Sequence, residues 1–275
     1  MSDPGLTAEH AESHVLDEKR IHQQRLPLPL SALLNHNSSG TTSTSPQHHD
    51  LRSFLNYVQR TGLSKASSVY AGTRYEYVVQ ATLQRYGFDL VRCGGRGDLG
   101  VDLVGYWYLP TRTKGPGPLR VVVQCKWAGG KGTKMGPNLV RELEGAARGI
   151  RVPGWRDLDH TVGVLVGSRP ATAGVTDGMR RSTRALAWVM LEEEGEQQQG
   201  EHLDGELSLG RVKQVLWNQR ARELGLEGVD VVRRYDRNGK EEVVLMYRGN
   251  LVKGVDEMKE EEKNLSQAAQ ESTCG

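Results

Sequence analysis

The segment Val-Val-Val-Gln-Cys-Lys-Trp at residues 121–127 is an apolar run interrupted by an amide and an ammonium group. In a β-strand successive side chains point to opposite faces, so Gln124 and Lys126 share one face while Val123 and Cys125 share the other. Burying an amide and a charged amine within a sheet costs free energy unless both groups find partners. The segment therefore predicts a core strand with a polar site on one face.

Asp102 is the candidate partner for these two side chains. It belongs to another strand-like segment, residues 101–108, and a loop with Pro and Gly separates this segment from the interrupted strand. A carboxylate and a carbonyl oxygen at one sheet edge suit Mg²⁺, or Mn²⁺ in its place, and a nearby lysine can orient an attacking water. Asp102 and Gln124 are thus the predicted metal ligands, and Lys126 is the predicted catalytic lysine.

Charge is distributed unevenly along the chain. Residues 51–190 hold 21 Lys and Arg against 9 Asp and Glu, a net charge of +12, whereas the remainder holds 15 against 25, a net of −10. A basic globular segment attracts polyanions. DNA is therefore the predicted partner, with RNA as a further possibility, and a merely soluble basic surface is the alternative.

Cysteine usage and hydropathy indicate a protein of a reducing compartment that does not insert into a membrane. The three cysteines form no CxxC pair and no even set. No apolar run is long enough to cross a bilayer. Five acidic residues between positions 3 and 18 weaken any reading of the amino terminus as a targeting peptide. The sequence leaves the oligomeric state open.

Hydrophobic periodicity predicts an α/β fold. The expected elements are a helix over 72–86, strands over 88–93, 101–108 and 119–127, a helix over 137–149, a strand over 160–166, a helix over 171–183 and a strand over 187–191. This order predicts a mixed central sheet with helices on both sides. A helix over 208–224 and a hairpin, with strands 229–235 and 241–247 around a turn at 236–239, are expected to close the fold.

Three blocks carry a resemblance to a known family. Residues 94–103 (GGRGDLGVDL), 123–126 (VQCK) and 140–146 (VRELEGA) resemble the catalytic domain of the Mrr group of restriction endonucleases, within the PD-(D/E)XK nuclease superfamily. The resemblance covers roughly residues 70–191. It implies a restriction endonuclease-like fold with an αβββαβ core, Mg²⁺ as cofactor, and catalytic roles for four residues, Glu76, Asp102, Gln124 and Lys126. The commoner superfamily motif has Glu where this chain has Gln124, so the metal site lacks one negative charge.

The carboxy-terminal part, with Leu216-Trp217-Asn218, resembles the fungal mitochondrial "required for respiratory growth" proteins. This resemblance implies a mitochondrial location and a role in mitochondrial DNA maintenance. Together the two resemblances suggest a metal-dependent endonuclease that hydrolyses phosphodiester bonds in DNA. The alternative is a nucleic-acid-binding protein that retains the nuclease fold with weak catalysis or none.

Several candidate residues also have a purely structural interpretation. Thr73 and Glu76 have the spacing of a capping box at a helix start, which is compatible with a site role for Glu76. Asp98 is expected to form a turn, and Thr172 to cap a helix. Glu142 lies either on the polar face of its helix or in support of the site.

These patterns divide the chain into five parts. They are a disordered leader (1–50), an Mrr-like domain (51–191), an acidic insertion or linker (192–206), a helix and hairpin that complete the domain (207–254), and a charged, disordered tail (255–275).

Overall fold

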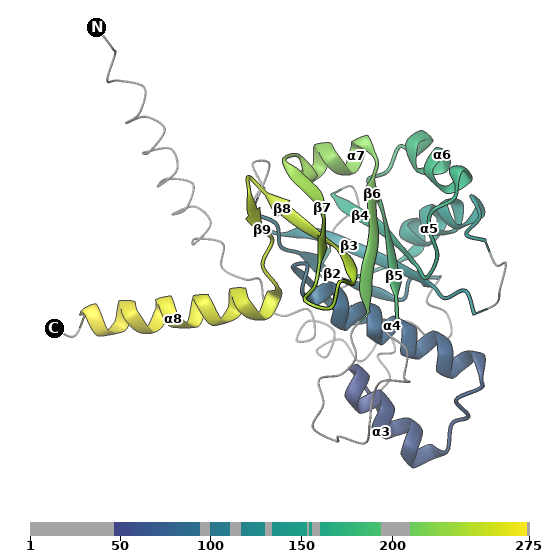
Figure 1. Ribbon diagram of the computed structural model, residues 1–275, viewed down its shortest axis with the longest axis horizontal. Coiled ribbons are helices and arrows are strands. Elements are labelled where there is room, and N and C mark those ends of the chain that lie inside the picture. Colours follow the sequence, from purple (N-terminus) through teal and green to yellow (C-terminus); the bar gives the residue numbers. More distant parts are fainter. Residues whose placement is uncertain are drawn as a thin grey trace, which may run out of the picture.

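The computed structural model describes residues 47–93, 100–110, 117–129, 134–152, 154–155, 160–193 and 210–273. Its centre is a six-stranded sheet in the order β1-β2-β3-β4-β5-β6 (Figure 1). The strands are β1 (Phe88–Arg92), β2 (Leu103–Trp107), β3 (Leu119–Lys126), β4 (Thr161–Gly167), β5 (Leu186–Glu192) and β6 (Arg211–Trp217). Strands β1 to β3 are antiparallel, β3 to β5 are parallel, and β6 is antiparallel to β5. The predicted mixed α/β class is confirmed.

Helices cover both faces of this sheet. Alternation along β3 directs Val121 and Val123 into one apolar cluster and Val122 into the other. The first cluster includes α3 (Leu51–Thr61) and α4 (Ser68–Gln84), and the second includes α5 (Asn138–Gly149) and α6 (Ala173–Arg181). The sheet is therefore buried between two helical layers, which accounts for the continuous apolar run of β4.

The helix expected over 208–224 is instead strand β6, followed by the short helical turns α7 (Gln219–Ala221) and η2 (Arg222–Leu226). Val212, Val215 and Leu216 have the spacing of a helical face, and that spacing misled the prediction. Residues 186–191 of β5 are all buried, so an unpaired edge would leave buried backbone groups without partners. β6 covers that edge, with a register shift between Met190 and Leu191.

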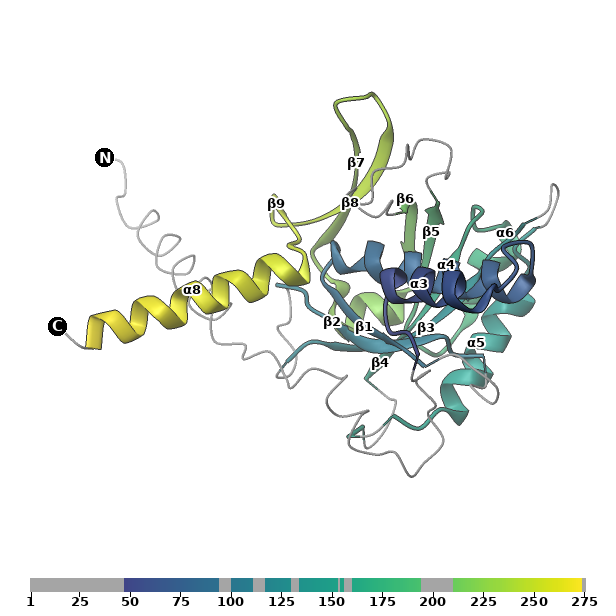
Figure 2. The same ribbon diagram turned by 90° about the horizontal axis from the view of Figure 1, so that it is seen from below.

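The predicted hairpin is confirmed. Strands β7 (Val229–Tyr235) and β8 (Glu241–Tyr247) pair antiparallel, and β9 (Asn250–Leu251) adds to β8 to form a second sheet. Asp236 Oδ1 accepts the backbone amides of Asn238 and Lys240, each at 2.8 Å, and Gly239 has a φ of +72°. The side-chain bonds and the left-handed glycine fix the turn. Figure 2 shows the hairpin standing away from the central sheet.

Helix α8 (Val255–Thr273) occupies the tail that was expected to be disordered, and it extends away from the sheet in Figures 1 and 2. Its Glu, Lys, Gln and Ala residues are strong helix formers, which favours a helix in this segment. The expected leader and acidic insertion fall outside the described residues, except for residues 47–50 and 192–193. No helix among the described segments is both long and apolar enough to span a bilayer.

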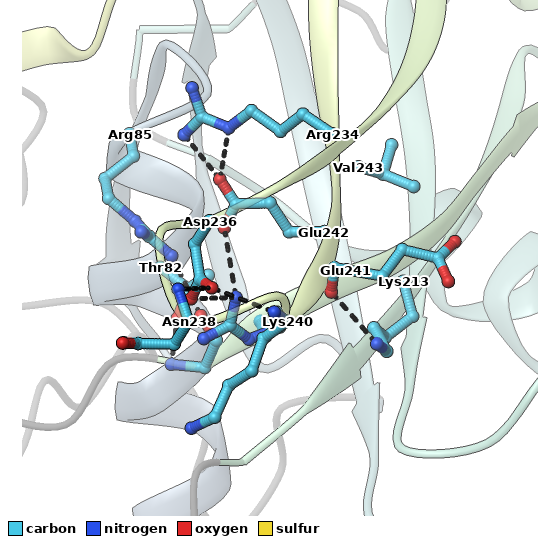
Figure 3. Close-up of polar contacts among 12 residues, drawn as sticks. Thr82, Arg85, Lys213, Arg234, Asp236, Asn238, Lys240, Glu241, Glu242 and Val243 are labelled. Atoms are coloured by element: carbon cyan, nitrogen blue, oxygen red, sulfur yellow. Dashed lines mark hydrogen bonds and ion pairs between the residues drawn. The ribbon is translucent and has the colours of Figure 1, made fainter.

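A buried carboxylate joins the hairpin to the central sheet. Glu242 of β8 is 7% exposed, and Arg234 Nε donates to its Oε1 at 2.7 Å (Figure 3). Arg211 Nη1 of β6 lies 4.0 Å from Glu242 Oε2 and donates to Asp236 Oδ2 at 3.1 Å. Lys213 Nζ of β6 donates to the Glu241 carbonyl at 2.9 Å. Charge pairing as well as apolar packing therefore positions the hairpin on β6.

We predict that Glu242→Ala lowers the free energy of unfolding by about 2 kcal/mol, because it removes the buried counter-charge of Arg234 and one of the two acids beside Arg211. The value is below that of a fully buried pair because the Arg234 side chain is 52% exposed. The control is the neighbouring Glu241→Ala, whose side chain pairs with the 74% exposed Arg233 and should cost less than about 1 kcal/mol. Urea unfolding of the two variants measures both values; equal losses would contradict the role given to Glu242.

Candidate active site

The candidate site begins where β2 and β3 separate. Leu103 and Val123 are the last paired residues of the two strands, and the Asp102 amide still donates to the Val123 carbonyl at 2.9 Å. Beyond this point the Asp102 side chain replaces the missing strand partner, because its Oδ2 accepts the Cys125 amide at 2.6 Å. The carboxylate predicted to face β3 therefore does contact that strand.

Gln124 lies on β3, and its side chain is buried. It is 3% exposed, and its Oε1 is one of the buried side-chain oxygens that accept no hydrogen bond. Gly100 covers it: a Cβ at Gly100 would lie 3.2 Å from Gln124 Nε2, and the Gly100 φ of +85° also favours glycine. A buried carbonyl oxygen without a partner is costly and is well placed to accept a donor or a cation.

Lys126 is held by helix α5. Its Nζ lies 3.3 Å from Glu142 Oε2, and the other oxygen of Glu142 accepts Asn138 Nδ2 at 2.8 Å. The hydrogen bond from Asn138 lowers the pKa of the Glu142 carboxyl, as does Lys126, against a smaller effect of burial. Glu142 is exposed on α5 and contacts Lys126 from there, so its place on the polar face of the helix is compatible with a site role.

Glu76 does not cap a helix. Helix α4 begins at Ser68, and the Ser67 side chain accepts the Tyr70 amide, so Thr73 and Glu76 lie inside the helix. The capping prediction for Glu76 is therefore wrong. The Glu76 carboxylate instead forms an ion pair with Arg92 Nε, in which both side chains are largely buried.

Arg92 links Glu76 to Asp102. Burial alone would lower the pKa of the Arg92 guanidinium. Glu76, Tyr77 and Asp102 act in the opposite direction, and the pKa is raised overall. Burial raises the pKa of the Cys125 thiol well above its usual value, and the Asp102 and Glu76 carboxylates add to that shift. Glu76, Arg92, Asp102 and Cys125 thus form one electrostatic cluster. Lys126 is paired on the other side of β3, with α5.

Sequence reasoning missed Arg92. The signal was present, because an arginine ends a largely apolar segment just before a glycine-rich stretch of the sequence. Asp98, predicted to form a turn, lies outside the described residues. The predicted cap is confirmed: Thr172 Oγ1 accepts the Val175 amide at 3.4 Å at the start of α6.

The donor set fits a small, hard cation with few protein ligands. Across the described segments, no three His, Cys, Asp or Glu side chains gather closely enough to hold a metal ion. Mg²⁺ is often held by only one or two carboxylates together with waters and substrate phosphates. Asp102 supplies one carboxylate, and the buried Gln124 Oε1 supplies an oxygen that accepts nothing else. These two residues would hold the ion.

The fold and site define a mixed α/β protein with a carboxylate, a buried amide and a lysine at the ends of adjacent strands. The profile of the family "Required for respiratory growth protein 7" matches residues 67–116 and 111–235, more than half of the chain. The chain therefore belongs to that family, as the carboxy-terminal resemblance predicted.

One curated relative is a protein of Schizosaccharomyces pombe described as uncharacterized and mitochondrial. It is 40% identical over 115 residues, which cover 42% of this chain and 44% of the relative. The chain thus matches less than half the length of that relative. No solved structure matches the chain.

We predict that Asp102→Asn speeds alkylation of Cys125 in the folded protein. The asparagine oxygen can still accept the Cys125 amide, but the negative charge that raises the thiol pKa is removed. One pKa unit changes the thiolate fraction about tenfold, so we expect a rate increase of about twofold to tenfold at pH 8. Peptide mass spectrometry measures the rate in a Cys274→Ser background, with the exposed Asp177→Asn as control. An unchanged rate would contradict the effect of the Asp102 charge on the thiol pKa of Cys125.

Proposed function

We propose that this protein is a metal-dependent nuclease that hydrolyses phosphodiester bonds in mitochondrial DNA. The observation that carries the proposal is Gln124: a buried carbonyl oxygen without a partner, on the strand that also carries Lys126 and contacts Asp102. The resemblance to Mrr-type catalytic domains assigns catalytic roles to these three residues and to Glu76.

The mitochondrial location rests on two findings. The family is named for respiratory growth, and the Schizosaccharomyces pombe relative is named as mitochondrial. The location expected from the family resemblance is therefore confirmed, and the protein is mitochondrial. DNA is the substrate proposed for it there because residues 51–190 carry a net charge of +12.

The residues of the chain divide the chemical work between them. Lys126, held by Glu142, orients the attacking water and stabilises negative charge that develops on the phosphate. Asp102 and Gln124 would hold Mg²⁺ or Mn²⁺, which when bound lowers the pKa of water and neutralises phosphate charge. Glu76 acts through its ion pair with Arg92, which keeps a positive charge beside Asp102 and fixes the position of the helix relative to β1.

The second candidate function is nucleic-acid binding without cleavage. The observation that favours it is that Gln124 is neutral. Of the two proposed metal ligands, one, Asp102, carries a negative charge. A site with less negative charge binds divalent cations more weakly. The two functions differ in whether a purified preparation cleaves DNA when metal is supplied.

We predict that the purified protein nicks or degrades plasmid DNA in Mg²⁺ or Mn²⁺, and that Asp102→Ala and Lys126→Ala each reduce the rate by at least about a hundredfold. Gln124→Glu should preserve activity or raise it, because an added carboxylate tightens the metal. Agarose-gel assays measure cleavage. DNA binding, measured by anisotropy without metal, should persist in each variant.

The matched controls are Asp177→Ala and Lys65→Ala, which remove an exposed Asp on α6 and an exposed Lys between α3 and α4. Both should cleave like the wild type. If the wild type is inert and Gln124→Glu cleaves, the chain retains the nuclease fold but has lost activity through the neutral side chain at position 124. If neither protein cleaves DNA or RNA with either metal, nucleic-acid binding without cleavage is the function that stands.

A further inference from the structure

The second sheet, residues 229–251, presents cations outward; we call it the wing. Six consecutive residues of β7, Asp230 to Tyr235, are exposed, although they form a regular strand. The exposed cations of the wing are Arg233, Arg234, Arg237, Lys240 and Arg248. Asp230 is its one exposed acid. Strands normally bury side chains on at least one face, and residues 230–235 of β7 bury neither face in this chain.

Two other acids of the wing, Glu242 and Asp236, lie next to Arg211 of β6. Glu242 is buried under Arg234, and Asp236 pairs with Arg211 (Figure 3). The Glu241 side chain is one-third exposed and lies 3.4 Å from Arg233. Together with Arg211 and Lys213, the wing holds seven Lys and Arg against four Asp and Glu. The excess of positive charge therefore lies on the solvent side.

Aromatic rings lie among these cations. Tyr235, at the end of β7, is 67% exposed, and the Arg248 guanidinium lies 5.2 Å from the centre of the Tyr247 ring. Guanidinium groups bind phosphates, and exposed aromatic rings stack on bases or sugars. This combination is typical of surfaces that bind nucleic acid.

The wing is placed to act together with the candidate active site. Asp236, in the turn of the wing, contacts the Arg211 side chain. In the backbone register of the sheet, Arg211 of β6 lies opposite Glu192 at the carboxyl end of β5. β3, β4 and β5 are parallel, so Lys126, at the carboxyl end of β3, lies at the same end of the sheet as Glu192. β6 is three strands from β3, about 14 Å at the usual strand spacing. The wing packs on the α4 side of the sheet and Lys126 is paired on the α5 side, so a nucleic acid that contacts both passes around this end of the sheet.

We propose that the wing is a nucleic-acid-binding element that contacts the phosphate backbone outside the candidate active site. The proposal rests on the proposed function in that the wing binds the same nucleic acid that the site would cleave. A second copy of the chain, paired edge to edge along β7, is the less favourable occupant. It would bring two sets of the same cations together, whereas a polyanion neutralises them.

The test removes three wing cations in the full-length protein: Arg233→Ala, Arg237→Ala and Lys240→Ala. The matched control removes three exposed cations around helix α3: Arg52→Ala, Arg60→Ala and Lys65→Ala. Binding to a labelled 20-base-pair duplex is followed by fluorescence anisotropy in EDTA between about 50 and 200 mM salt, the range in which phosphate contacts dominate affinity. Circular dichroism melting confirms that both variants are folded.

We expect the wing variant to bind at least about tenfold more weakly at 100 mM salt, and its slope of log K against log salt to become shallower by about 2 to 3, since each lost phosphate contact removes about 0.9. The control variant should keep the wild-type slope to within about 1. Equal losses in both variants, or no loss in either, would overturn the proposal. So would a DNA-free dimer in light scattering that the wing variant abolishes, because the wing would then be a surface between copies.

Metal-free binding separates this proposal from the proposed nuclease activity. If wild type binds DNA through the wing but never cleaves it in Mg²⁺ or Mn²⁺, the nuclease assignment fails and the wing stands. If wild type cleaves DNA and both triple variants bind as tightly as wild type, the wing assignment fails and the nuclease stands.

Discussion

The separation of β2 from β3 is the constraint on which the candidate site depends. The antiparallel ladder ends at Leu103 and Val123, and the next amide of β3 in need of a partner, that of Cys125, is taken by the Asp102 carboxylate. The same carboxylate lies in the electrostatic environment of Arg92. One side chain thus closes the backbone hydrogen bonding of the sheet and brings negative charge to its edge, so structure and chemistry depend on the same residue.

The two faces of β3 then receive different tasks. On the α4 side the charges are paired within the protein: Glu76 with Arg92, beside the raised-pKa thiol of Cys125. On the α5 side Lys126 is paired with the half-exposed Glu142, in a contact open to solvent. A buried ion pair resists rearrangement because breaking it exposes an uncompensated charge, whereas a solvent-exposed pair exchanges partners at little cost. Lys126 is therefore the cation of the candidate site that can exchange its partner at the lower cost.

The sequence was sufficient wherever periodicity alone decides the structure. Strands β1 to β5 follow from short apolar segments, continuous in β4 and β5, and the hairpin turn follows from the glycine at 239. Strand β6 did not follow, since Val212, Val215 and Leu216 fit a helical face and only the exposed edge of β5 selects a strand. Arg92 and Glu142 were not identified as the ion-pair partners of Glu76 and Lys126, because those partners come from elements that meet only in the folded chain.

The neutral side chain at 124 is consistent with this arrangement. At 3% exposure, a carboxylate at this position, as in Gln124→Glu, would depend on the bound cation for its counter-charge, because an unpaired buried charge is severely destabilising. An amide oxygen without a partner costs only about 1 to 3 kcal/mol, so the strand can fold before any cation or donor arrives. The same neutrality reduces the attraction for a divalent cation. Under the proposed function, Gln124 would lower the affinity for metal and keep the site stable without it, and substrate phosphates would have to supply the missing negative charge. Such a site would bind a cation most tightly when nucleic acid is already in place.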